Sequence, residues 1–140
     1  TANKSPDPGL PAMSTCMGCH LIATANKPET QKMAKLYAMG GPQGKPVPWI
    51  RIHKLPEYVR FPHMRHVNAG VTCQSCHGAI QDMTQVAQNA SLNMGWCVNC
   101  HVNGYKLSDG LLAAGDTAGA KAAANVEPKK ARYDCAVCHY

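Results

Sequence analysis

Apolar side chains recur at helical spacing in one clear stretch of the chain, residues 28–39. Pro28 opens this stretch with an acidic residue behind it, which is typical of a first helical turn. Apolar residues then follow at intervals of three and four, which places them on one face of a helix. Gly40-Gly41 ends the run, as glycine commonly does after a helix. The pattern predicts a helix over 28–39.

Proline interrupts the chain on both sides of this predicted helix. Residues 1–12 are proline-rich and are expected to be extended. Residues 41–62 contain five prolines, and their apolar positions alternate only weakly, as in short edge strands or loop segments. Residues 125–134 form a basic linker near the end of the chain.

Two further stretches have helical character. Residues 79–90 form a polar run that predicts a helix after a glycine. Residues 108–124 are rich in alanine and glycine, and they open at Ser108 with Asp109 behind it, a pair suited to a helix N-cap. The three glycines within this stretch weaken the predicted helix.

Composition changes the picture of the core. The 140 residues include one Phe, two Trp, 12 Gly and 10 Pro, and aromatic residues make up only 6%. A chain of this length is expected to form a single domain, 1–140. Its own side chains supply little for a core, so large apolar groups bound to the chain would have to replace them.

One five-residue motif, Cys-x-x-Cys-His, occurs four times and uses all eight cysteines. The copies are Cys16–His20, Cys73–His77, Cys97–His101 and Cys135–His139. The motif is the attachment signature of c-type haem: two thiols add to the vinyl groups of the porphyrin, and the adjacent histidine binds the iron. The cysteines that would hold haem are Cys16, Cys19, Cys73, Cys76, Cys97, Cys100, Cys135 and Cys138. The proximal iron ligands would be His20, His77, His101 and His139. Four covalently attached haems are therefore predicted.

Zinc sites and disulfides are the two rival interpretations of eight cysteines. Zinc sites pair Cys-x-x-Cys units with histidines at independent spacings rather than one after every pair. A disulfide framework gives no reason for a histidine beside every second cysteine. The sequence therefore favours a mostly irregular fold with short α-helices and little β-structure, wrapped around four haems.

The sequence offers fewer histidines as sixth ligands than the four predicted haem irons need. Outside the motifs only His53, His63 and His66 remain, and each is a predicted distal ligand. Four low-spin irons need four such ligands. A methionine sulfur could complete the set, with Met94 as first choice and Met83 as second. The alternative is one open iron that binds small molecules.

The net charge and the hydropathy of the chain indicate which partners and which cellular compartment to expect. The formal net charge is +6, but the haem propionates would offset it, and the basic residues are scattered. A nucleic-acid partner is therefore not expected. No stretch has the apolar length of a membrane span. Because this motif receives haem outside the cytoplasm, and the polar start suits a chain whose export signal has been removed, we expect a periplasmic or extracellular protein.

Several stretches resemble the multihaem class III cytochromes, in particular the pentahaem subunit of bacterial alternative complex III, a quinol-oxidising respiratory complex. They are Cys16–His20, Pro48–Pro56, Phe61–Val67, Gly70–Cys73 and Met94–His101. The resemblance implies that His53, His63 and His66 are distal ligands, and that Met94 is a credible one. It also implies an irregular, helix-containing fold on closely spaced haems.

Electron transfer is the function that these features favour, in a protein that is not an enzyme. With four motifs rather than five, the chain fits a stand-alone carrier, or the haem subunit of a respiratory or photosynthetic complex. Its partners would be donor and acceptor redox proteins, with docking on a membrane complex as one setting. Two alternatives are a multihaem reductase with one open iron and a self-assembling protomer of an extracellular cytochrome filament.

Overall fold

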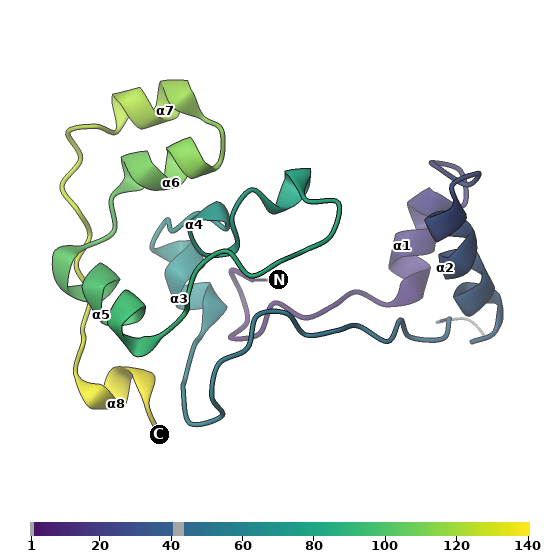
Figure 1. The fold of residues 1–140 in the computed structure, drawn as a ribbon, viewed down its shortest axis with the longest axis horizontal. Coiled ribbons are helices and arrows are strands. Elements are labelled where there is room, and N and C mark those ends of the chain that lie inside the picture. Colours follow the sequence, from purple (N-terminus) through teal and green to yellow (C-terminus); the bar gives the residue numbers. More distant parts are fainter. Residues whose placement is uncertain (1, 41–43) are drawn as a thin grey trace. The chain divides into compact units, whose positions relative to one another are not determined.

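The computed structural model describes residues 2–40 and 44–140 (Figure 1). These residues form two compact units. The smaller unit is Gly9–Arg51, and the larger unit joins residues 2–8 to Ile52–Tyr140. Short helices and irregular segments make up both units, and the described residues contain no β-strand. The predicted fold class, mostly irregular with short helices, is confirmed.

The smaller unit is a pair of packed helices, α1 (Met13–His20) and α2 (Pro28–Ala38). The second confirms the helix predicted over 28–39, one residue shorter, with proline in its first turn. Gly41, predicted to end this helix, lies outside the described residues. Met13 and Met17 of α1 are buried in the unit.

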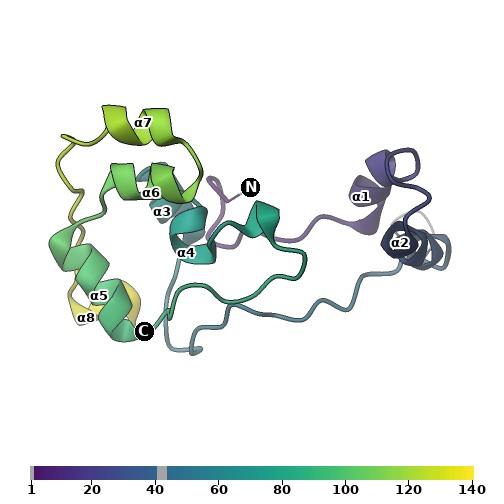
Figure 2. The same ribbon diagram turned by 45° about the horizontal axis from the view of Figure 1, so that its top comes forward.

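The larger unit consists of short helices joined by turns (Figures 1 and 2). They are α3 (His63–Asn68), α4 (Gln74–His77), the 3₁₀ helix η2 (Ile80–Asp82), α5 (Met94–Asn103), α6 (Leu107–Ala113), α7 (Thr117–Ala122) and α8 (Cys135–Cys138). Helices α6 and α7 pack together, and α4 packs on α6. Asn93 caps α5 by accepting a hydrogen bond from the Trp96 amide at 2.8 Å.

The helix predicted over 79–90 is wrong, because only η2 forms there and the rest is irregular. Nearly all side chains in this stretch are exposed. A short helix without an apolar face to bury is only marginally stable in water, and no side chain caps η2.

The single helix predicted over 108–124 is also wrong, because two helices form. Gly115 has φ +83°, a left-handed conformation that ends α6 and turns the chain into α7. Asp116 then caps α7 by accepting from the Gly119 amide at 2.8 Å. Ser108 is not the N-cap of α6, which begins one residue earlier and has no side-chain cap.

Proline-rich segments run through both units without forming a sheet. Residues 44–62 are irregular, which agrees with the predicted loop segments and not with the predicted short edge strands. Residues 2–7 form turns and bends rather than the predicted extended chain, which begins only at 8. Val59 forms an isolated antiparallel bridge with His139.

The described residues bury few hydrophobic side chains. In the larger unit only Ala90, Ala120 and Ala123 are buried hydrophobic residues, and all three are small. A unit of this size normally needs a far larger apolar core or other cross-links. The described polypeptide therefore fits the expectation that bound groups supply most of the apolar interior.

Candidate haem sites

Each Cys-x-x-Cys-His motif coincides with a short helix. The first lies in α1, the second begins at the N-cap of α4, the third lies in α5, and α8 holds the two cysteines of the fourth. Helical residues three and four apart project from one face, so both thiols and the imidazole of each of the first three motifs can reach one planar group. All eight cysteines lie within the described residues, and none of them forms a disulfide.

The effects of the cysteines on one another's pKa values show that the second, third and fourth motifs lie close together in the larger unit. Burial raises the pKa of Cys76 to about 11, and repulsion from Cys100, Cys97 and Cys73 adds to the rise. Burial also raises the pKa of Cys97, with Cys138 as the next cause. The second motif therefore lies near the third, and the third lies near the fourth.

Backbone carbonyls orient the two histidines of α3. The Nδ1 atom of His63 lies 3.3 Å from the carbonyl oxygen of Pro6, and that of His66 lies 3.2 Å from the carbonyl oxygen of Pro62. Carbonyl oxygens only accept hydrogen bonds, so each Nδ1 donates and carries the ring proton. The lone pair of each Nε2 is then available for a metal ion.

Two proximal histidines have the same arrangement. In α1, Nδ1 of His20 lies 3.0 Å from the hydroxyl oxygen of Thr24, which in turn lies 3.1 Å from that of Thr30. In α5, Nδ1 of His101 donates to the carbonyl oxygen of Arg132. The carbonyl oxygen fixes the tautomer of His101, and each partner orients the ring that it contacts.

The imidazoles of predicted distal and predicted proximal ligands lie near one another in two pairs. The rings of His63 and His77 are nearly parallel, 10° apart, with centroids 6.5 Å apart. The rings of His66 and His101 have centroids 6.1 Å apart at 49°. Two imidazoles bound to opposite sides of one iron place their centroids about 6 Å apart, because each metal–nitrogen bond is about 2 Å long. Both pairs fit ligation of a haem iron.

Comparison with known families matches a part of the chain that holds His66, His77 and His101 of these pairs. A family profile described as cytochrome c3 matches residues 65–140, which is more than half of the chain. The chain belongs to the cytochrome c3 family. A comparison with curated proteins found no matching sequence.

Membership implies a multihaem cytochrome that transfers electrons through covalently bound c-type haem. The matched residues hold the second, third and fourth motifs, and the first motif lies outside them. The narrower resemblance to the alternative complex III subunit stays a prediction. In the described parts of the cytochrome, no helix is both long and apolar enough to cross a membrane.

The neutral form is favoured for two of the paired histidines in the cytochrome. Burial lowers the pKa of His66, although its hydrogen bond to Pro62 opposes the change. Burial also lowers the pKa of His77, followed by the effects of His53 and His63. The neutral imidazole is the form that binds a metal.

His53, the third predicted distal ligand, contacts a proximal ligand directly. Its Nε2 lies 3.3 Å from Nδ1 of His77, and the two rings meet edge to face with centroids 4.3 Å apart. That distance is too short for an iron between these two rings.

The two candidate methionines occupy different settings. Met94 begins α5, and its side chain is 67% exposed. Because residues three and seven apart share a helix face, Met94 lies on the same face as Cys97 and His101. Met94 therefore lies on the side of α5 that carries the predicted proximal ligand, and not on the side opposite it. Met83 follows η2 and is half-buried.

The segment Tyr58–Arg60 contacts the fourth motif, although nothing in the sequence connects the two. The amide of Arg60 donates to the carbonyl oxygen of Cys138 at 2.7 Å, and the Tyr140 amide donates to that of Tyr58 at 3.2 Å. The Tyr58 ring stacks on the imidazole of His139, with centroids 5.7 Å apart at 27°. No sequence signal pointed to Tyr58, because the two segments are nearly eighty positions apart.

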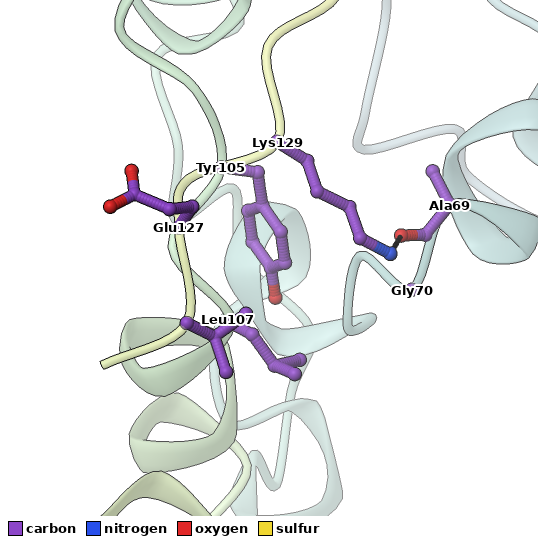
Figure 3. Close-up of a pocket in the computed structure, with 7 residues that line it drawn as sticks. Ala69, Gly70, Tyr105, Leu107, Glu127 and Lys129 are labelled. Carbon is purple, nitrogen blue, oxygen red and sulfur yellow. Dashed lines mark hydrogen bonds between the residues drawn. The ribbon is translucent and has the colours of Figure 1, made fainter. Parts of the chain in front are cut away.

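A small pocket lies beside the second motif (Figure 3). Tyr105, Leu107 and Lys129 line it, and Lys129 donates to the carbonyl oxygen of Ala69 at 2.8 Å across one side. Its volume of about 10 Å³ has room for roughly one water molecule. This pocket is a packing feature and offers no substrate site.

Proposed function

We propose that the chain is a tetrahaem c-type cytochrome that carries electrons, with residues 1–140 as its functional domain. The observation that supports this most strongly is the pairing of His63 with His77 and of His66 with His101. Paired imidazoles leave an iron without a site for substrate, which favours electron transfer over catalysis. When bound, each haem supplies an iron that gains and loses one electron.

The pairs assign two distal ligands. His63 serves the iron that His77 binds, and His66 serves the iron that His101 binds. The carbonyl oxygens of Pro6 and Pro62 hold the two distal rings in position. His53 remains a proposed ligand as well.

Met94 is proposed as the sixth ligand of the iron that His139 binds. Met94 lies on the same helix face as His101, and not on the side opposite that proximal ligand of the third iron. The same face carries Cys97, whose pKa is raised by burial and then by repulsion from Cys138 of the fourth motif. A thioether favours ferrous iron, so this haem would have a higher potential than a bis-histidine haem.

The haem cofactor also indicates the cellular compartment and the kind of partner protein. Covalent attachment of haem outside the cytoplasm supports a periplasmic or extracellular site of action. Donor and acceptor would be redox proteins that dock weakly and briefly, since such encounters bury small interfaces. Docking on a respiratory or photosynthetic membrane complex is included in this proposal, and the resemblance to a pentahaem respiratory subunit supports it.

The test combines haem counting with a redox titration followed by electron paramagnetic resonance. The holoprotein is expected to carry four haems by mass, with histidine–histidine signals and one histidine–methionine signal. Carbon monoxide should bind none of the four reduced irons in substantial amount. Fewer than four haems, or stoichiometric binding of carbon monoxide at one iron, would overturn the proposal.

A further inference from the structure

The last residues of the chain are covered by one short segment, Tyr58–Arg60. Two backbone hydrogen bonds and the bridge between Val59 and His139 pair this segment with Cys138–Tyr140. Tyr58 stacks on His139, and the guanidinium of Arg60 lies over the Tyr140 ring at 4.6 Å from its centroid.

We infer that Tyr58 is a positioning residue for the fourth haem, because its ring fixes the plane of the proximal imidazole and shields one side of it from water. This rests on the proposed binding of iron by His139. The four residues of α8 end at Cys138, so His139 lies in extended backbone beyond the helix. The helix itself therefore does not hold this imidazole, unlike those of the first three motifs.

The geometry separates the role of the ring from that of the backbone. Ring centroids 5.7 Å apart at a small angle are within the range of favourable aromatic pairs. The flanking hydrogen bonds use only main-chain atoms of Tyr58 and Arg60. A substitution that removes the ring of Tyr58 therefore leaves the pairing of the two segments in place.

Loss of the Tyr58 ring should change the redox potential of one haem iron, the fourth. Solvent exposure and hydrogen bonding around an axial ligand tune the potential of haem. When the ring is absent, water reaches the His139 imidazole, and the more highly charged ferric state gains stabilisation. The potential of the fourth haem should then fall, while the other three stay unchanged.

The experiment compares three variants of the holoprotein by redox titration and electron paramagnetic resonance. Tyr58→Ala should shift one of the four redox transitions to lower potential and change one low-spin signal. Tyr58→Phe should restore both, because the ring remains. Tyr133→Ala is the matched control, because Tyr133 lies two residues before Cys135. Tyr133 is 64% exposed, close to the 62% of Tyr58. This variant should change neither the redox transitions nor the low-spin signals.

Each outcome decides the inference. Four unchanged potentials and signals in Tyr58→Ala would refute it, as would a shift in Tyr58→Phe equal to that in Tyr58→Ala. A common shift of all four transitions would also refute it, because that indicates general loosening. If Tyr58→Ala matures poorly, Tyr58→Ser also removes the ring and admits water, and it should show the same single shift. A wild-type protein that lacks the fourth haem by mass would instead overturn the proposed function.

Discussion

The imidazoles of His63 and His77 are parallel to within 10° and lie 6.5 Å apart, although they belong to different helices. His63 is the first residue of α3, where backbone amides have no partner within the helix. Its amide donates to the carbonyl oxygen of Pro6 at 2.9 Å, and its Nδ1 lies 3.3 Å from the same oxygen. The N-terminal segment thus orients a ring that faces the second motif.

Replacing His63 should open one iron and no other. In the variant His63→Gly, the iron bound by His77 loses its distal ligand and becomes high-spin in the oxidised protein. Electron paramagnetic resonance should show one high-spin haem, and the reduced protein should bind about one equivalent of carbon monoxide. Added imidazole should restore the low-spin signal by occupying the space that the side chain left.

Arg65→Ala is the control for this prediction, because Arg65 lies on the same helix and is exposed. Its spectrum should match that of the unmodified protein. If His63→Gly keeps four low-spin haems without added imidazole, His63 is not a ligand and the pairing with His77 is wrong.

The substitution His66→Met should raise the potential of one haem, the one that His101 binds. A thioether favours the ferrous state relative to imidazole, so one redox transition should move upward while the other three stay in place. A redox titration measures this. Met64→Ala alters a half-buried neighbour in α3 and should leave all four transitions unchanged. A downward shift, or a shift of several haems, would contradict the assignment.

Met94 and Met83 can be separated by parallel substitutions. Met94→Ala should abolish the histidine–methionine signal and let one reduced haem bind carbon monoxide, because the fourth iron loses its sulfur ligand. Met83→Ala should retain both the signal and the resistance to carbon monoxide. The reverse result would transfer the role to Met83, and no change in either variant would exclude both.

The sequence predicted the cofactor chemistry well because that chemistry depends on local spacing. Thiols three apart with an adjacent histidine define each motif, and a short helix is found at each of the four motifs. The helix over 28–39 was predictable for the same reason. Its proline start and its apolar face are local features.

Contacts between distant segments were not predictable from the same information. The spacing of His63 and His66 indicated two ligands, but which iron each faces depends on how α3 lies against α4 and α5. The stacking of Tyr58 on His139 likewise depends on two segments far apart in the sequence. At Gly115 the weakness of a long helix was visible in the sequence, whereas the left-handed φ of +83° that divides it was not.

The division between α6 and α7 leads to a prediction about stability. Asp116 accepts a hydrogen bond from the amide of Gly119 at 2.8 Å and thereby caps α7. Losing an N-cap side chain costs about 1 kcal/mol. Asp116→Ala should therefore lower the free energy of unfolding of the holoprotein by about that amount, seen as a lower urea midpoint at unchanged slope.

Asp116→Asn keeps an oxygen in the capping position and should recover most of the loss. Asp109→Ala provides the matched control, since Asp109 lies in the first turn of α6 but is not its N-cap. Its urea midpoint should change by less than that of Asp116→Ala. Equal losses in the two alanine variants would mean that charge near the helix starts, rather than the cap itself, stabilises the pair of helices that packs beside the second motif.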